Sequence, residues 1–372
     1  MNAPTPFPYT TASLRAGDPR FVERRPGIQD IERLFPSPVT AGKGRMAVEG
    51  GVSVVGGPGM GKTSLFAQLA SVLAGDRRFT TATVPFPPAE NYTGEAGFYA
   101  FLGELVLRIH LGLSQSQRVQ ENPDSALAVA LQATPGWDVP GAQAMTPRGF
   151  ERFITTIAHS ALHTPGICLL FDDVDQIGSA TWKGPFISAL RFVFQTSSGI
   201  TPIYALWTLF GDESLPGSNY FRNVTRPVFL EPLAAESAAA VGETRSKLII
   251  LGMPELRDDT RLAVGRLAGG HPLSLHRVLA DLQARLPTAS DRSALMPEQI
   301  DVALGASLVA AQRELVVQLL GHSPGLPAAL AELRRKRMGY AELPRGLVAS
   351  GFVDQTDDGI AVLAGRASDA IP

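Results

Sequence analysis

The chain has 372 residues, of which 45% are hydrophobic, and 33 Lys and Arg balance 35 Asp and Glu to give a formal net charge of −2. The hydrophobic share excludes a wholly disordered chain, and the charge balance argues against a protein that coats nucleic acid. With Cys168 as its one cysteine, the chain can form no internal disulfide and no zinc site of several thiolates, so we expect a reducing compartment.

The N-terminal segment, residues 1–20, is rich in Pro and Thr and predicts a flexible arm. It lacks the basic stretch and apolar stretch of a secretory signal, and no apolar run in the chain approaches the ~20 residues that cross a bilayer. We therefore expect a cytoplasmic protein with no membrane association. Apolar residues at helical spacing then predict a short helix over 28–35.

Strands and helices alternate between residues 50 and 210. Apolar runs predict strands at 51–55, 80–86, 167–171 and 203–210, and helical periodicity predicts helices at 64–70, 97–110, 150–163 and 186–194. The polar segment 112–148, which contains Pro and Gly, predicts an insertion. This alternation predicts an α/β fold in which a parallel sheet carries helices on both faces.

The strand signal stops after residue 230. Residues 234–251, 258–268 and 273–286 predict consecutive helices, and three helical stretches after residue 297 precede a hairpin that turns at 357–359. Three helices followed by a hairpin resemble a winged helix. The sequence thus predicts an arm at 1–20, a core at 21–230, a helical lid at 231–296 and a small winged-helix-like domain at 297–372.

The most specific motif is residues 56–63, which match G-x-x-x-x-G-K-[ST] at every fixed position. An apolar strand precedes the motif and a helix follows it, so its glycines can turn backbone N–H groups inward toward an anion. We expect Lys62 to reach the β- and γ-phosphates and Thr63 to bind Mg²⁺. The residues expected to hold the nucleotide here are Gly56, Gly57, Pro58, Gly59, Met60, Gly61, Lys62, Thr63 and Ser64.

Acidic residues follow the apolar strand 167–171, where the second half of such a site belongs. We expect Asp172 to hold Mg²⁺, directly or through water, and Asp173 to orient or deprotonate the attacking water. With Lys62, Asp173 is the predicted catalytic residue. Aspartate reaches less far than the glutamate of many ATPases, which predicts slow turnover. Asp175 fits a helix cap as well as a site residue.

Together these motifs resemble the STAND class of P-loop ATPases, relatives of AAA+ proteins, over about residues 20–290. Phe21 and Val22 precede Glu23 and Arg24 in a segment similar to the F-V-G-R of that class, which usually contacts adenine, although Glu23 replaces the glycine. Residues 270–272 are similar to its G-x-P motif, and the resemblance implies that Pro272 packs near adenine. Residues 229–233 are similar to the L-x-P-L connector. ATP or ADP with Mg²⁺ are the cofactors that the resemblance implies.

The chain departs from origin-recognition initiators, which usually carry a sensor arginine just after the glycine at this helix start, whereas here His271 and Pro272 follow it. Thr208 is the candidate for the polar sensor residue on the last core strand. Arg222 and Arg226 come later, and each fits a γ-phosphate contact in the same or a neighbouring subunit, or simple surface exposure.

The remaining candidates have simpler explanations. His159 and His163 have metal-ligand spacing on a helix but no third ligand, and Cys168 fits an inert core residue. His271 fits a phosphate contact or a histidine held by backbone bonds. The basic run Arg334, Arg335, Lys336 and Arg337 fits duplex DNA, but residues 300–372 hold seven basic and eight acidic side chains, which favours a solvated or protein-binding face.

The leading hypothesis is an ATP-binding, slowly hydrolysing STAND or AAA+-like switch in a multi-component bacterial regulatory or anti-phage defence system. The chain has no room for an effector domain or sensor repeats, so we expect a separately encoded effector or sensor protein as its partner, and nucleotide-dependent homo-oligomers are compatible with the class. One alternative is a DNA-associated AAA+ ATPase, an initiator or transposition regulator that binds duplex DNA through its winged helix. The other is a scaffold that keeps ADP bound and never hydrolyses ATP.

Overall fold

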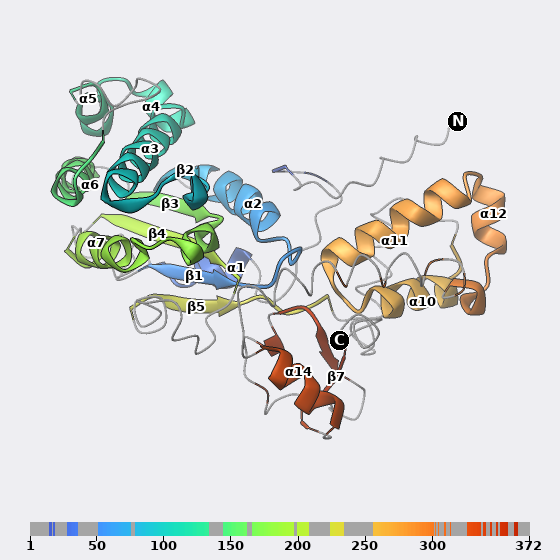
Figure 1. Ribbon diagram of the computed structural model, residues 1–372. Helices are drawn as coiled ribbons and strands as arrows, with labels where there is room; N and C mark the ends of the chain where they lie inside the picture. The colour runs from blue at the N-terminus through green and yellow to red at the C-terminus, as the bar shows by residue number, and fades with distance from the viewer. Residues whose placement is uncertain are drawn as a thin grey trace. The chain divides into compact units, whose positions relative to one another are not determined.

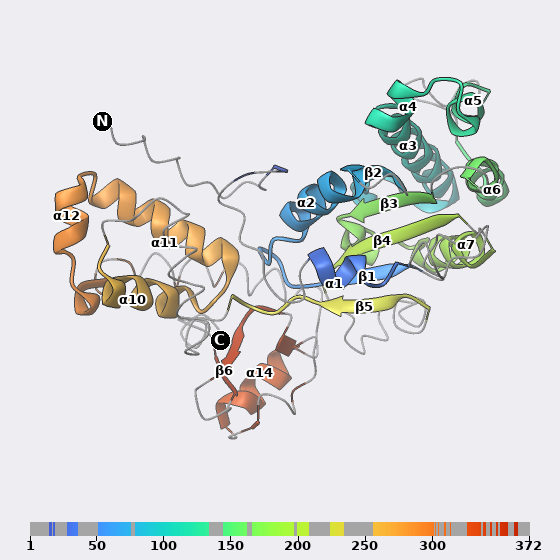
Figure 2. The same ribbon diagram turned by 180° about the vertical axis from the view of Figure 1, so that it is seen from behind.

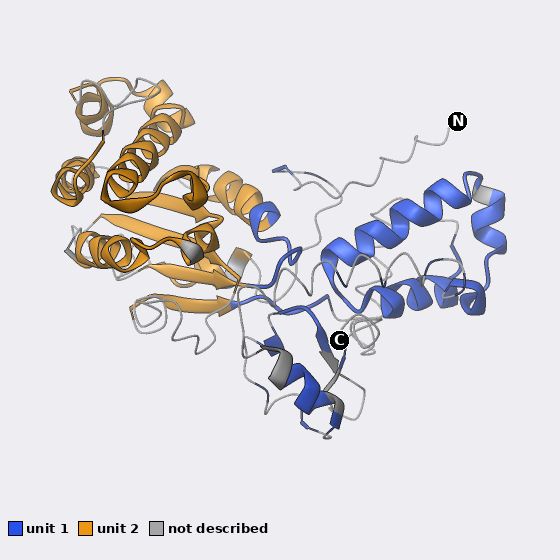
Figure 3. Ribbon diagram, viewed as in Figure 1, with its two compact units in different colours: residues 1–26, 56–64, 229–372 blue, residues 27–55, 65–228 orange. Residues whose placement is uncertain are grey.

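The structure is a computed structural model. It describes residues 28–35, 51–75, 79–133, 144–161, 166–196, 199–207, 224–233 and 256–300, with parts of 15–18 and 302–363. The chain divides into two compact units (Figure 3). Unit 1 comprises Met1–Pro26, Gly56–Ser64 and Phe229–Pro372, and unit 2 comprises Gly27–Val55 and Leu65–Val228. The domain boundaries predicted from the sequence stay predictions.

Unit 2 is built on a five-stranded sheet of order β2-β3-β4-β1-β5 (Figures 1 and 2). The strands are β1 (Val52–Val55), β2 (Phe79–Pro85), β3 (Gly166–Asp172), β4 (Ile200–Leu206) and β5 (Arg226–Phe229). β1 pairs with β4, β4 with β3 and β3 with β2, all in parallel. This confirms the predicted parallel sheet. The fifth strand contains Pro227 and lies at the edge, where a missing N–H is tolerated.

Helices cover this sheet, and its three internal strands, β1, β3 and β4, are buried along their whole length. The helices are α1 (Ile28–Glu32), α2 (Lys62–Gly75), η1 (Ala89–Asn91), α3 (Gly94–Ser114), α4 (Gln117–Glu121), α5 (Ala126–Gln132), α6 (Pro147–Ala161), η2 (Val174–Ser179) and α7 (Lys183–Thr196). Phe171 joins an aromatic cluster and stacks on Tyr204 with ring centroids 5.4 Å apart. Cys168, which faces the opposite side of β3, is buried as well, so both faces are covered.

Part of the polar segment 112–148, predicted as an insertion, is helical in the described residues 112–133. α3 continues to Ser114, and two short helices, α4 and α5, follow it. Ser125 caps α5 by accepting a hydrogen bond from the Ala128 N–H at 3.2 Å. Leu127 and Leu131 join the main core cluster. Helical periodicity does not predict these two helices, because each is only one or two turns long.

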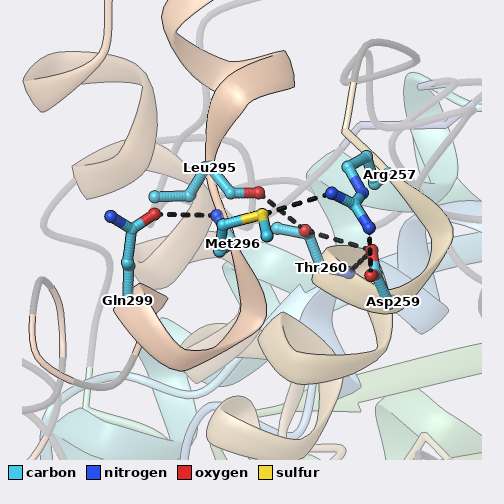
Figure 4. A network of polar contacts seen from close by, with 6 residues as sticks. All are labelled: Arg257, Asp259, Thr260, Leu295, Met296 and Gln299. Atoms are coloured by element: carbon cyan, nitrogen blue, oxygen red, sulfur yellow. Dashed lines mark hydrogen bonds and ion pairs between the residues drawn. The ribbon is translucent and has the colours of Figure 1, made fainter.

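The helical part of unit 1 contains α10 (Asp258–Ala268), α11 (Pro272–Arg285) and α12 (Ala289–Ala294). Apolar residues of α10 and α11 form a separate core cluster together with Leu295 and Ile300. α10 and α11 confirm the helices predicted at 258–268 and 273–286, while the one predicted at 234–251 lies outside the described residues. Figure 4 shows how the start of α10 is tied to the segment after α12. The Thr260 hydroxyl donates to the Leu295 carbonyl at 2.9 Å, and Arg257 pairs with Asp259 at 2.8 Å.

The C-terminal part of unit 1 contains α14 (Leu326–Arg335) and two antiparallel strands, β6 (Val353–Gln355) and β7 (Ala361–Leu363). The paired strands confirm the hairpin predicted at this place, although its turn at 357–359 lies outside the described residues. The winged-helix arrangement stays a prediction, because most of 301–325 is also outside them.

Among the described residues, α3 is the one helix that is long and apolar enough to cross a membrane by length and composition. More than half of its apolar window is buried inside the protein, at 56%. Phe101, Leu105 and Ile109 of α3 lie in the main core cluster, and such a core helix passes the same test.

We predict that Cys168 of the native protein reacts with DTNB about 100-fold more slowly than in guanidinium chloride, because reaction requires local opening of a buried strand. Burial also raises the pKa of the Cys168 thiol well above its ordinary value, so the reactive thiolate stays scarce even at mildly alkaline pH. Equal labelling rates in the native and denatured protein would contradict the buried position of β3.

Candidate phosphate-binding site

The loop at 56–61 has the backbone conformation that an anion nest requires. Gly59 and Gly61 have φ angles of +74° and +76°, which a side chain would make unfavourable. The Met60 N–H donates to the Gly57 carbonyl at 3.2 Å and closes the turn. α2 begins at Lys62, so the N–H groups of its first turn, which have no acceptor within the helix, follow the loop directly.

Lys62 is held by the loop that it belongs to. Its Nζ donates to the Gly56 carbonyl at 2.7 Å and to the Gly57 carbonyl at 3.0 Å, and the residue is 8% exposed. These two bonds use two of the three N–H donors of the ammonium. Next to it, Thr63 is exposed and Ser64 is half-buried.

The acidic pair stands where β3 ends. Asp172 is the last residue of the strand and 3% exposed, and its Oδ1 accepts a hydrogen bond from the Asp173 N–H at 3.0 Å. Asp173 is exposed and has left-handed backbone angles (φ 56°, ψ 33°). Among the described residues, it is the one non-glycine residue with a positive φ. This conformation costs about 1 kcal/mol in a residue with a side chain and often occurs at functional sites.

Within unit 2, the strands that precede the two predicted motifs end at the same edge of the sheet. β1 and β3 lie on either side of β4 and run parallel to it. Val55 ends β1 and Asp172 ends β3, so both strands end at the carboxyl edge of the sheet. Ligands of open parallel sheets bind at this edge.

His271 ties the start of α11 to the phosphate loop. Its Nδ1 accepts a hydrogen bond from the Ser274 N–H at 3.3 Å, which places the ring proton on Nε2. Nε2 then donates to the Pro58 carbonyl at 3.0 Å, and the residue is 1% exposed. Of the two roles that the sequence left open for His271, the structure shows the one in which backbone groups hold the ring.

The first turn of α11 adds a second bond to the loop. Pro272 occupies the first helical position and is half-buried, and the Leu273 N–H donates to the Gly59 carbonyl at 3.2 Å. A methyl group on Gly59 would lie 2.7 Å from the His271 ring and 2.9 Å from the Leu273 side chain. The loop therefore lies directly against the helix start that carries the G-x-P motif.

The turn at 350–352, just before β6, also lies against the phosphate loop. The Ser350 carbonyl packs on Gly57, and Gly351, with a φ of +82°, packs on Met60 and His271. The Phe352 ring stacks on His271, with centroids 5.9 Å apart and planes 21° apart. No sequence motif pointed to these three residues, because they act through backbone proximity and one apolar ring.

Several predicted residues are not brought to this site. Phe21, Val22, Thr208 and Arg222 lie outside the described residues. Arg226 is exposed on β5, and its N–H donates to the Gly51 carbonyl at the start of β1. Gly51 and Gly56 stand at opposite ends of β1, about 16 Å apart along an extended strand, so Arg226 is not at the end that carries the loop.

The other candidates are accounted for by local contacts where they are described. His159 is exposed and bonds the Thr155 carbonyl through Nδ1 at 2.7 Å, while His163 lies outside the described residues. No group of three metal-ligating side chains occurs in the part of the chain that was searched, the described residues. Arg335 is exposed at the end of α14, but the side chains of Arg334, Lys336 and Arg337 are not described, so DNA binding through this run stays a prediction.

No family model matches the chain, and no curated protein matches it. Among solved structures, the Walker-type ATPase PABY2304 of Pyrococcus abyssi has a TM-score of 0.55 at 11% identity, covering 97% of this chain and 99% of that chain. Cdc6p from Pyrobaculum aerophilum gives 0.44 at 13%, covering 91% and 88%, and the RuvB Holliday junction branch migration motor of Thermotoga maritima gives 0.39 at 13%, covering 87% of each. The first similarity supports the P-loop ATPase fold, and the other two are too distant to support a conclusion.

We predict that Gly59→Ala lowers the melting temperature by about 4 °C or more, because it places a side chain at positive φ and against His271 and Leu273. Gly75→Ala is the matched control, since a methyl group at the end of α2 would meet no atom within 4 Å. It should leave the melting temperature unchanged or raise it slightly. Equal effects of the two substitutions in a thermal unfolding scan would contradict the loop conformation described above.

Proposed function

We propose that this chain binds ATP with Mg²⁺, hydrolyses it slowly and uses the bound nucleotide to control its C-terminal part, as a STAND or AAA+-like switch. The observation that carries the proposal is that the phosphate loop is held at once by His271 and by the turn at 350–352. A ligand that rearranges this loop must therefore act on both.

The residues of the loop fit a nucleotide phosphate chain. Gly59 and Gly61 supply the positive φ angles of a nest, Lys62 supplies a cation, and α2 begins at the same point. The exposed Thr63 hydroxyl and the Asp172 carboxylate are oxygen ligands of the kind that Mg²⁺ prefers. When bound, Mg²⁺ would neutralise charge on the β- and γ-phosphates.

The roles of the chain's own residues follow from these positions. Lys62 exchanges its bonds to the Gly56 and Gly57 carbonyls for bonds to phosphate oxygens, which are stronger because both partners are charged. Asp173, exposed at the end of β3, orients the attacking water and accepts its proton. Its side chain is one methylene shorter than glutamate, which is consistent with slow hydrolysis.

The same exchange supports a coupling between nucleotide and C-terminal part. Release of Lys62 removes one of the two hydrogen bonds that the Gly57 carbonyl accepts, and Ser350 packs on the same residue. The next two carbonyls, of Pro58 and Gly59, are bonded to His271 and Leu273 at the start of α11. A nucleotide that favours one loop conformation over another therefore biases the position of these contacts.

The wider role is also part of the proposal. The resemblance described above favours a regulatory or anti-phage defence system in which a separately encoded effector or sensor protein receives the signal. Identification of the neighbouring genes would test this point.

We predict that Lys62→Ala weakens the binding of ATP and ADP by about 100-fold or more, because the phosphates lose their charged hydrogen-bond donor. Isothermal titration calorimetry checks the result. Arg226→Ala is the matched control, since Arg226 is exposed and stands at the other end of β1, and it should keep wild-type affinity. A Lys62→Ala protein that still binds ATP with micromolar affinity would rule out this loop as the site.

We predict that Asp173→Asn keeps ATP affinity but slows hydrolysis by about 100-fold to 10,000-fold, because the amide cannot accept the proton of the attacking water. Phosphate release and binding are measured on the same preparation. A wild-type protein that releases bound ADP on denaturation but shows no hydrolysis, unaltered by Asp173→Asn, would favour the ADP scaffold.

The Asp173→Asn protein also tests the switch, because it can be held with ATP bound. Hydrogen exchange of the segment 350–355 should differ between its ATP-bound and ADP-bound forms. Identical exchange in the two forms would refute the coupling while leaving ATP hydrolysis intact.

A further inference from the structure

The ends of β3 and β4 are joined by a side chain that the hydrolysis mechanism does not use. Oδ2 of Asp175 accepts a hydrogen bond from the Trp207 N–H at 2.6 Å. This distance is short for an N–H donor, as is typical when the acceptor is charged. Both residues belong to unit 2, and Asp175 is half-buried.

The register of the sheet explains why this bond forms. β3 and β4 pair with Phe171 beside Tyr204, so a continued β3 would bring Val174 beside Trp207. β3 ends instead at Asp172, and the left-handed turn at Asp173 takes the chain out of the strand. The carboxylate of Asp175 thus supplies an acceptor for Trp207 at a point where the β3 backbone no longer runs beside β4.

The segment that carries Asp175 is held firmly. It forms the 3-10 helix η2, in which Val174 and Ile177 are buried in the main core cluster. The Lys183 Nζ donates to the Gly178 carbonyl at 2.9 Å and ties the end of η2 to α7. Asp175 does not act as a helix cap, because the N-cap position of η2 is Asp173 and no side chain caps it.

We propose that Asp175 is a positioning residue for ATP hydrolysis. Its bond to the Trp207 N–H fixes the backbone just after β4 relative to the end of β3, which carries Asp172 and Asp173. The residue after Trp207 is Thr208, the sensor candidate, which lies outside the described residues. The proposal rests on the proposed function, since it assigns Asp175 a part in the same reaction without any contact to the nucleotide.

The test compares Asp175→Ala, which removes the acceptor, with Asp175→Asn, whose amide oxygen can still accept the bond. Gln176→Ala is the control, because Gln176 is an exposed neighbour in the same 3-10 helix. We expect Asp175→Ala to lower kcat about 30-fold with the Kd for ADP unchanged, because a small displacement of reacting groups is costly to the chemical step alone. Asp175→Asn should restore most of kcat, and Gln176→Ala should keep wild-type kcat.

A second measurement does not depend on turnover. The amide of Trp207 should exchange with solvent about 10-fold faster in Asp175→Ala than in the wild type, because it loses its acceptor. The amide of Ala205, inside β4, should be unaffected. Mass spectrometry with fragmentation resolves the two positions.

Wild-type kcat in Asp175→Ala would overturn the proposal and leave the proposed function standing. An equal loss of kcat in Asp175→Ala and Asp175→Asn would also overturn it, since loss of the bond to Trp207 would then not explain the loss of kcat. A wild-type protein that binds ATP without hydrolysing it would instead contradict the proposed function. In that case unchanged exchange at Trp207 would still overturn the positioning role of Asp175.

Discussion

The site depends on the need to satisfy the outward carbonyls of the phosphate loop. A loop that turns its N–H groups toward an anion directs carbonyl oxygens elsewhere, and each needs a donor when water is excluded. Here the four successive carbonyls from Gly56 to Gly59 all have one, supplied by Lys62, the Met60 N–H, His271 and the Leu273 N–H. Two of these donors come from the start of α11, more than 200 residues later in the sequence. The backbone geometry that suits the loop for phosphate is therefore also what attaches the helical part of unit 1 to it.

A similar constraint shapes the exit of β3. The strand must end at Asp172 if the acidic side chains are to lie at the edge of the sheet, and the left-handed backbone of Asp173 ends it within one residue. That early end leaves the neighbouring strand with an N–H at Trp207 that β3 no longer faces, and Asp175 accepts it. Residues 172–175 therefore hold three acids with different surroundings. Asp172 is buried at the strand end, Asp173 is exposed, and Asp175 accepts a backbone N–H.

Much of this could be predicted from the sequence, because the signals are local. The glycines and Lys62 of the phosphate loop, the apolar strand before Asp172 and the alternation of strands with helices each depend on residues that are close in the chain. The helices at 117–121 and 126–132 could not be predicted, because both are short and the second packs on the core through Leu127 and Leu131. The sequence also placed His271 in a motif without indicating its bonding partners. Pro58, to which His271 donates, lies 213 positions away in the chain.

The sequence by itself determined the α/β class of the fold, the phosphate loop and the acidic residues at the end of a buried strand, since periodicity and motif spacing are properties of short segments. Only the tertiary structure decided that Lys62 bonds the loop carbonyls, that His271 donates to Pro58, and that the turn at 350–352 lies on Gly57 and Met60. It also decided that Arg226 stands at the start of β1, away from the end that carries the loop. These relations join residues up to about 300 positions apart. They follow from strand order and close packing, which local sequence propensity does not determine.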